Sequence, residues 1–357
     1  MRTPVVLVTG VDPDAMAATV VGLQFDLPTT VAVRHHIDPG RSVLIRVVSD
    51  LTGVLEREEI DLAHACVSCA LREDVLPTLE RLSREGRWQS IVAHLPTGAE
   101  AGQVCAVLAQ DTRLARHLRV SSVVAAVAGG SVAADLLGDD LLAERGHHSG
   151  EEDRRGVGEV QAALVEYADV VVADGGLDDA GRELLETLAR PGAQVVAGVE
   201  HVDVPSLTTV LHQHDRTLAW IDPVLTVPFP RVRLQHVWRL DLVSPLAFHP
   251  ERLLDDLESL GSGEHRSRGC FWLPTRPDRV ITWDGAGGQL SIGDHGAWAQ
   301  RAPLTRLVLT GLGRPGEQLA EAFRRLLLTP DEAAARGSWR TSYDGFEPWL
   351  GPIREVA

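Results

Sequence analysis

The stretch Val5–Leu23, VVLVTGVDPDAMAATVVGL, decides the fold of the first half of the chain. Its first five residues, Val5–Thr9, form a continuous apolar run rich in β-branched side chains, which is typical of a strand buried on both faces. Gly10 ends this run, and Ala15–Leu23 has the character of a helix. A strand, a glycine turn and a helix in this order are where a phosphate-binding loop is expected.

The side chains that such a loop needs are absent. The pattern G-x-x-x-x-G-K-[ST] offers backbone N–H groups and a lysine to the phosphates, and a hydroxyl group to magnesium. Counted from Gly10, the three positions with a chemical task hold Ala15, Met16 and Ala17. The charged residues of the loop itself are Asp12 and Asp14, which would repel a triphosphate. We therefore expect this loop to bind neither GTP nor Mg²⁺.

Further apolar segments alternate with helical ones in the N-terminal half. Strands are expected over 29–33, 42–48, 89–94, 120–128 and 169–172, and helices over 72–85 and 102–117. Such alternation indicates right-handed βαβ units and an α/β fold, a P-loop-like parallel sheet with flanking helices. Ligand sites in these sheets lie at the carboxyl ends of the strands. His94 ends one of the expected strands, although an ordinary buried or surface histidine is the simpler interpretation.

A close pair of cysteines lies between the second and third of these strands. Residues 62–76 read LAHACVSCALREDVL, in which Cys66 and Cys69 have the C-x-x-C spacing that aims two sulfurs at one metal ion. The alternative is that both are small buried side chains at a helix start, because free cysteine often packs as a hydrophobe. The candidates for the remaining ligands are, in order, His64, His94 and Cys105.

A second nucleotide-binding element is also missing. In a guanine-nucleotide protein the strand over 169–172 would lead to N-K-x-D, whose carboxylate pairs with the guanine base. The corresponding positions, Asp174–Leu177, read DGGL. Because two distant elements have both lost their chemistry, we expect a pseudo-enzyme without catalytic residues.

Composition limits the class of protein further. The 357 residues suggest about two domains, and a net charge of 34 − 50 = −16 argues against direct binding to nucleic acid. Four cysteines are too few for a disulfide framework, so metal or redox chemistry in a reducing compartment is the better use of the close pair. No apolar run has membrane-spanning length, and no signal peptide precedes the first strand. We expect a cytoplasmic protein that does not enter a membrane.

The chain is expected to divide into a domain over 1–200, a linker over 201–231 and a second domain over 232–357. The linker region is rich in His, Pro and Thr, with Pro223, Pro228 and Pro230 disfavouring regular structure. The linker histidines are His201, His212 and His214; a metal-buffering tract is conceivable, but a solvated linker is the favoured interpretation. In the second domain, strands over 232–243 and 306–310 and helices over 250–260 and 316–328 surround an aromatic, Gly-broken segment. This pattern predicts a small α+β domain.

Several C-terminal segments resemble the C-terminal domain of the CobW family, the metal-handling P-loop GTPases of cobalamin synthesis and zinc homeostasis. They are FHPERL (248–253), RSRGCFWL (266–273), TRPD (275–278), WDGAGG (283–288) and Trp298. The cysteine segment is similar to the family's C-x-C-C-T-x-R-x-D-L metal motif. Cys66 and Cys69 match its first and last cysteines, Ser68 replaces the middle one, and Arg72 and Asp74 fall on motif positions.

The acid that ends the family's second nucleotide strand is His94 in this chain. A C-V-S-C segment beside a degenerate phosphate loop resembles one branch of the family, the actinobacterial proteins that recruit a ribosome hibernation factor under zinc starvation. This resemblance implies a non-catalytic, zinc-responsive adaptor whose partners are the ribosome hibernation promoting factor and the small ribosomal subunit. The alternatives are a GTP-dependent metallochaperone for zinc or cobalt and a structural relic whose cysteines are merely packed.

Overall fold

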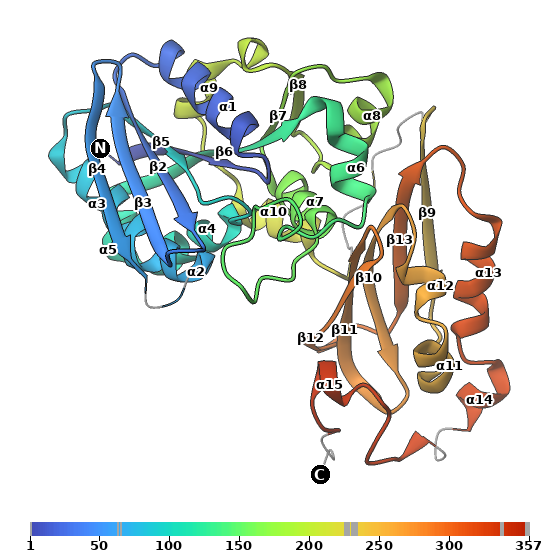
Figure 1. Ribbon diagram of the computed structural model, residues 1–357. Helices are drawn as coiled ribbons and strands as arrows, with labels where there is room; N and C mark the ends of the chain where they lie inside the picture. Colours follow the sequence, from blue (N-terminus) through green and yellow to red (C-terminus); the bar gives the residue numbers. More distant parts are fainter. Residues whose placement is uncertain are drawn as a thin grey trace. The chain divides into compact units, whose positions relative to one another are not determined.

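The computed structural model describes residues 2–62, 64, 66–224, 229, 235–335 and 339–353 (Figure 1). The chain forms two compact units, Met1–Asp135 with Asp140–Leu218 and Leu136–Asp139 with Ala219–Ala357. This division differs from the expected linker over 201–231, since the first unit extends to Leu218. Pro228, Pro230 and the first residues of the strand expected over 232–243 lie outside the described residues.

The first unit contains an eight-stranded sheet in the order β4-β3-β2-β5-β1-β6-β7-β8. Its strands are β1 (Thr3–Thr9), β2 (Thr30–Asp38), β3 (Val43–Asp50), β4 (Gly53–Asp61), β5 (Ser90–His94), β6 (Leu118–Ala128), β7 (Val170–Asp174) and β8 (Gln194–Ala197). The strands from β2 to β8 in this order pair in parallel, whereas β3 and β4 form an antiparallel edge. The expected α/β class is confirmed, with the antiparallel edge as an addition.

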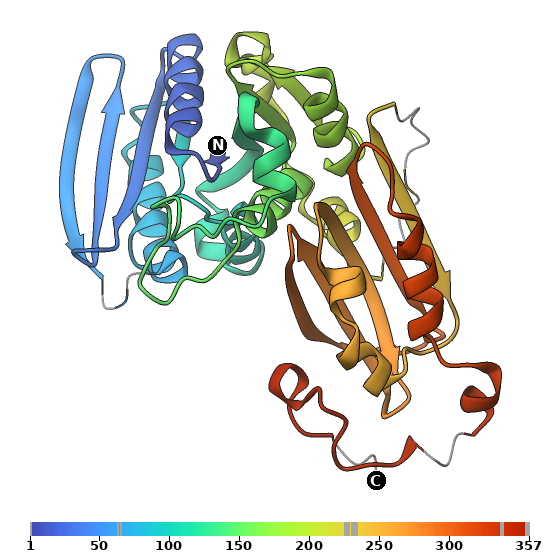
Figure 2. The same ribbon diagram turned by 45° about the vertical axis from the view of Figure 1, so that its right-hand side comes forward.

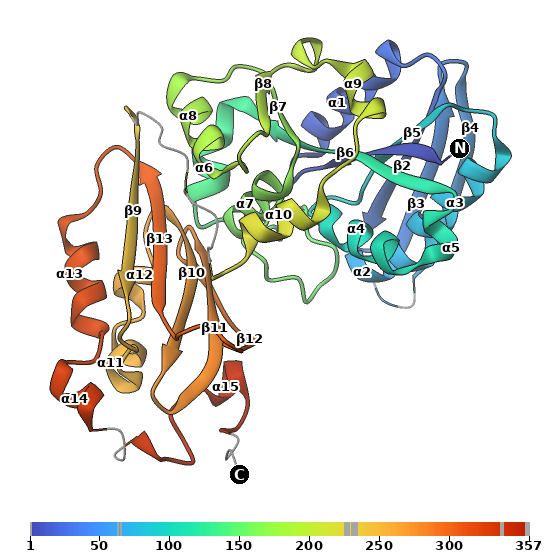
Figure 3. The ribbon, with the colours of Figure 1, turned by 180° about the vertical axis from the view of Figure 1, so that it is seen from behind.

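Helices cover both faces of this sheet (Figures 1 and 3). They are α1 (Pro13–Asp26), α2 (Val67–Ala70), α3 (Leu76–Glu85), α4 (Ala101–Gln110), α5 (Thr112–Ala115), α6 (Val132–Leu137), α7 (Val157–Tyr167), α8 (Asp179–Leu188), α9 (Val204–Thr209) and α10 (His214–Ile221). A π-helical segment, Leu71–Val75, joins α2 to α3. The helices α1 and α9 lie on one face, and α3, α4, α5 and α7 lie on the other.

The core of the first unit forms where α1 and α9 pack on the central strands. Met16 and Leu23 of α1 are fully buried against Val6, Val92 and Val124 of the sheet. Burying such apolar side chains is the dominant favourable contribution to folding. Because β1 and α1 pack together in this core, the turn that joins them is held at both ends.

The second unit is a five-stranded antiparallel sheet in the order β12-β11-β10-β13-β9, with helices on one face (Figure 2). Its elements are β9 (Val237–Ser244), α11 (Pro250–Asp255), α12 (Glu258–Gly261), β10 (His265–Leu273), β11 (Arg276–Ala286), β12 (Gln289–Ala297), β13 (Thr305–Leu312), α13 (Glu317–Leu326), α14 (Pro330–Ala334) and α15 (Glu347–Leu350). Phe248, Phe271, Trp283, Phe323 and Phe346 form its core. The expected α+β domain is confirmed, although the helix expected over 250–260 is broken into α11 and α12.

In the part of the chain that the structure describes, none of the helices is both long and apolar enough to cross a bilayer.

Candidate metal-binding groove

The turn at the carboxyl end of β1 is short and capped by the chain itself. Only residues 10–12 connect β1 to α1, which begins at Pro13. The Asp12 carboxylate accepts hydrogen bonds from the backbone N–H groups of Asp14 and Ala15, at 2.9 and 2.8 Å. Free N–H groups at a helix start are the groups that bind phosphate. Here a carboxylate of the chain already contacts them.

Met16 fills the space beneath this turn. Its side chain is fully buried, and a Cβ atom built on Gly10 would lie 2.8 Å from Met16 Cγ and 2.5 Å from the carbonyl oxygen of Ala126. On its other side, Gly10 accepts a hydrogen bond from the N–H of Gly98 at 2.8 Å. Glycine is needed here for close packing of the turn.

The segment Asp174–Leu177, where a guanine-nucleotide protein would carry N-K-x-D, packs against Gly129, the residue that follows β6. A Cβ atom on Gly129 would lie 2.8 Å from the carbonyl oxygen of Gly176 and 3.0 Å from that of Asp174. Gly175 between them has φ +78°, a conformation that suits glycine. The Asp174 side chain is exposed at the end of β7.

The cysteine pair lies at the start of α2. Cys66 is the residue that caps α2, and its Sγ accepts a hydrogen bond from the N–H of Cys69 at 3.3 Å. Cys69 is buried and Cys66 is half-buried. The contact with Cys66, together with burial, raises the pKa of the Cys69 thiol. Two adjacent sulfurs at a helix start are suitable ligands for zinc, which binds thiolates.

Cys66 and His64 line one side of a groove of about 870 Å³ in the first unit. Its other lining residues include Glu100 and Gln103 near the start of α4 and the segment 149–155. Ser68, between the two cysteines, donates a hydrogen bond to Gln103 at 3.4 Å. Four carboxylates line this groove, which is a favourable environment for a cation.

The segment 149–155 contains an ion pair of its own and is joined to the rest of the unit by Arg155. Asp153 accepts hydrogen bonds from Ser149 at 3.0 Å and from the Arg155 guanidinium at 2.9 Å. Arg155 in turn donates to the carbonyl oxygen of Gly98 at 2.9 Å. One acid of the groove is therefore neutralised within the loop itself.

His94 lies at the carboxyl end of β5, as expected, but it does not line this groove. Its Nδ1 is 2.9 Å from the carbonyl oxygen of Leu95, and its Nε2 is buried without a hydrogen-bond partner. Burial lowers the pKa of His94 to about 4, so the imidazole is neutral at pH 7. His64 and Cys66 thus line the groove together, whereas Cys69, His94 and Cys105 are not among its lining residues.

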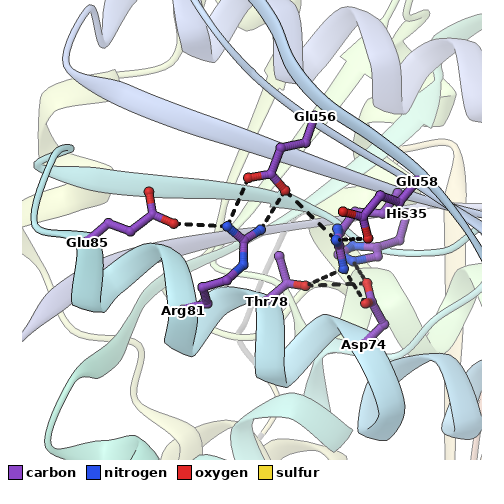
Figure 4. A network of polar contacts seen from close by, with 8 residues as sticks. His35, Glu56, Glu58, Asp74, Thr78, Arg81 and Glu85 are labelled. Carbon is purple, nitrogen blue, oxygen red and sulfur yellow. Dashed lines mark hydrogen bonds and ion pairs between the residues drawn. The ribbon is translucent and has the colours of Figure 1, made fainter.

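Asp74, at an acidic position of the resembled metal motif, belongs to a buried polar network instead (Figure 4). Its carboxylate contacts His35 Nε2 at 2.9 Å and forms an ion pair with Arg46. Burial alone would raise the pKa of Asp74, but these two partners outweigh it and lower the pKa. Arg72, the other motif position, is exposed and pairs with Glu73 at 3.0 Å.

A separate cluster contains residues that the sequence did not single out together. Cys105, on the buried face of α4, lies beside His212 and His214, which were assigned to a solvated linker. The His-x-His spacing was the available signal, but it gave no indication that α4 would lie next to it.

Residues 238–327 match the family model of the cobalamin synthesis protein cobW C-terminal domain. The chain is similar to the zinc chaperone Rv0106 of Mycobacterium tuberculosis, at 28% identity over 98% of this chain and 94% of the relative. It is also similar to the zinc-regulated GTPase metalloprotein activator 1 of Dictyostelium discoideum, at 19% identity over 67% of this chain and 54% of that protein. The Zn(II)-bound YjiA GTPase of E. coli aligns with a TM-score of 0.36 at 15% identity, over 91% of this chain and 99% of the other.

The fold defines a two-domain α/β protein that carries a CobW C-terminal domain. Residues 238–327 thus resemble the C-terminal domain of the CobW family, and a relative named zinc chaperone is similar to almost the whole chain.

Proposed function

We propose that this chain is a zinc-binding member of the CobW family that acts without hydrolysing GTP. The observation that carries the proposal is the closed turn after β1, where Asp12 caps the start of α1 and Met16 is buried beneath Gly10. A nucleotide would have to displace the Asp12 carboxylate from the N–H groups that bind phosphates in other proteins. It would also meet no lysine and no hydroxyl group at positions 16 and 17.

The zinc part of the proposal depends on the groove and on the relatives. Cys66, Cys69 and His64 supply sulfur and nitrogen donors, and the donor chemistry fits zinc. The name of the mycobacterial relative, zinc chaperone, supports the same metal. Bound zinc would supply a positive charge to a groove lined by carboxylates. The chain's own residues hold the two sulfurs together and, through the Ser68–Gln103 contact, join α2 to α4.

We further propose that zinc occupancy controls docking to a protein partner, the ribosome hibernation promoting factor, and through it to the small ribosomal subunit. The support is the sequence resemblance of the C-V-S-C segment with its degenerate phosphate loop. The net charge of −16 favours contacts with protein surfaces over contacts with ribosomal RNA.

Zinc titration followed by ribosome co-sedimentation tests this adaptor role. Purified chain and hibernation factor are mixed with ribosomes at a series of buffered zinc concentrations. We expect co-sedimentation to depend on zinc in the natural chain and to lose that dependence in a Cys66→Ser/Cys69→Ser variant. The matched control is Cys270→Ser, which removes a buried cysteine of the second unit. Unaltered zinc dependence in the double variant would contradict the sensing role.

The second candidate, a GTP-dependent metallochaperone, is favoured by the name of the Dictyostelium relative. Calorimetry with GTP and Mg²⁺ separates the two candidates. The closed turn predicts no measurable GTP binding by the natural chain. Tight binding, or hydrolysis above the rate in buffer, would establish the metallochaperone and refute the proposal.

A further inference from the structure

Three potential metal ligands converge at a second place in the first unit. Cys105 is buried in α4, His214 is the first residue of α10, and His212 lies two residues before it. One Sγ or ring nitrogen from each residue lies within 4.8 Å of the others. Among the described residues, no other group of three His, Cys, Asp or Glu side chains brings its ligand atoms this close together. The N–H of His212 donates to the carbonyl oxygen of Val120, near the amino end of β6. None of the three residues lines the groove at Cys66.

His212 is already oriented as a metal ligand would be. It is 6% exposed, and its Nδ1 lies 2.8 Å from the Asp169 carboxylate. That carboxylate is fixed by the N–H of Val123 at 2.7 Å and by an ion pair with Arg190. A carboxylate that accepts the Nδ1–H of a histidine leaves Nε2 with its lone pair, as is typical of zinc sites. The Nε2 of His212 is buried and has no hydrogen-bond partner.

Tyr167, at the end of α7, contacts the other two residues. Its hydroxyl group lies 2.6 Å from His214 Nδ1 and hydrogen-bonds to Cys105. α4 comes close to this ring because position 102 is glycine, where a Cβ atom would lie 3.2 Å from the Tyr167 ring. His214 is half-buried, so an ion can reach the cluster from solvent.

We propose that Cys105, His212 and His214 bind a zinc ion, with a fourth position open to water or to a ligand from a partner. One thiolate and two imidazoles form a donor set that zinc prefers, and three protein ligands leave one position of a tetrahedron free. On binding, the S–H bond of Cys105 breaks, its electron pair goes to the ion and the proton goes to solvent. The Asp169 carboxylate offsets part of the remaining positive charge.

The test uses the full chain with Cys66→Ser and Cys69→Ser, so that the groove contributes no sulfur. Zinc is measured by elemental analysis after gel filtration, and Co(II) is used as a spectroscopic probe. We expect one ion per chain and a thiolate-to-Co(II) charge-transfer band. Adding Cys105→Ser should abolish the band and weaken zinc binding more than about 100-fold, since even a change behind the ligands costs about 10–100-fold. Adding Cys270→Ser should change neither.

Two further variants separate metal binding from a purely structural hydrogen-bond cluster. Asp169→Asn should weaken zinc binding about 10–100-fold and keep the Co(II) band, because the sulfur remains. His214→Ala should weaken binding as well, and this half-buried position lets the metal-free chain fold, which thermal unfolding verifies. A Cys66→Ser/Cys69→Ser chain that binds no zinc, or a Co(II) band that survives Cys105→Ser, would overturn the proposal. Neither outcome bears on the proposed function, whose sulfurs are absent from this test.

Discussion

Asp74 falls where the resembled metal motif has an acid, yet both of its carboxylate oxygens contact other side chains of the protein. His35 and Arg46 are buried with it, so the three residues form a charged network inside the unit. Removing one partner of a buried ion pair leaves the other charge without compensation. A motif position can therefore stabilise the fold around a metal site without contacting the metal.

We expect Asp74→Asn to lower the free energy of unfolding by about 1–3 kcal/mol, because Arg46 loses its most buried carboxylate partner and keeps only the more exposed Glu56 and Glu58. Zinc stoichiometry should not change. Urea denaturation of the metal-free chain measures the first quantity and elemental analysis the second. Glu59→Gln, which removes an exposed partner of Arg41, is the matched control and should leave the free energy of unfolding almost unchanged. Loss of zinc at unchanged stability would instead identify Asp74 as a ligand.

Met16→Lys restores the lysine that a phosphate loop needs, but at a buried position of α1. We expect it to lower the free energy of unfolding by about 3 kcal/mol or more, because an ammonium group would enter the core without a partner. GTP binding, measured by calorimetry, should remain absent. Phe25→Lys on the same helix is the control, since Phe25 is 78% exposed. A gain of GTP affinity would show that the turn opens readily.

At the scale of elements, buried strands with continuous apolar runs were predictable, and segments with weak periodicity were not. Val5–Thr9 and Gln89–His94 were expected as strands and form β1 and β5, because their runs of apolar residues suit a strand covered on both faces. β4 was missed because it is an exposed edge strand rich in Glu. α9 and α10 were taken for a linker, since short helices in a His- and Pro-containing segment carry little periodic signal.

In the candidate sites, too, local sequence patterns were predictable and contacts between distant segments were not. The spacing of Cys66 and Cys69 is local, so the sequence alone predicted that their sulfurs lie together. The meeting of Cys105 with His212 depends on packing between α4 and a segment about one hundred residues later, which no local pattern encodes.

Gly269 of β10 is a position where the pairing of strands leaves no room for a side chain. A Cβ atom there would lie 1.9 Å from the carbonyl oxygen of Arg306 on β13. Gly269→Ala should therefore lower the thermal stability of the second unit, by about 2 kcal/mol or more in unfolding free energy. Gly288→Ala, where nothing lies within 4 Å of the added atom, should cost about 1 kcal/mol through its φ of +86° alone. Equal costs would contradict the close strand contact.

The C-terminal turn before α15 is held to β11 by Arg276, which donates to both carboxylate oxygens of Asp344 at 2.9 and 3.0 Å. Burial alone would raise the pKa of Asp344, but the hydrogen bonds from Arg276 and Thr275 outweigh it and lower the pKa below 3.8. A lowered pKa means that the folded state holds its proton less tightly than the unfolded state. The stabilisation is therefore present above about pH 3.8 and is lost as the pH falls further.

We expect the free energy of unfolding of the second unit to fall below about pH 3.8, and this fall to shrink in Asp344→Asn. Tryptophan fluorescence in urea at a series of pH values measures it. Asp278→Asn, an exposed position of β11, should leave the fall unchanged. An identical pH profile for natural chain and Asp344→Asn would contradict the role of this ion pair.

At the scale of the whole molecule, the two units carry very different spectroscopic reporters. Of the eight tryptophans, Trp88 lies in the first unit and the other seven lie in residues 219–357. The proposed zinc ligands all belong to the first unit. Ligand binding stabilises the part of a protein that binds, by about 2.7 kcal/mol at a concentration 100 times the dissociation constant.

Zinc should therefore raise the unfolding temperature of the first unit, which contains most of the helices and is followed by circular dichroism. In a Trp88→Phe/Trp220→Phe chain, whose remaining six tryptophans follow α10 and lie in the second unit, zinc should leave the fluorescence transition in place. A chain with Cys66, Cys69 and Cys105 all replaced by serine is the control, and should show no zinc effect with either probe. Equal shifts of both transitions would indicate that the units unfold as one.

The closed turn after β1 has a thermodynamic consequence for the proposed function. A protein that consumes no nucleotide has no source of work, so it cannot load an ion against a difference in chemical potential. Its occupancy can only follow the free zinc concentration reversibly, along a simple isotherm. The midpoint of that isotherm, set by a few sulfur and imidazole atoms, would then be the threshold of scarcity at which the protein responds.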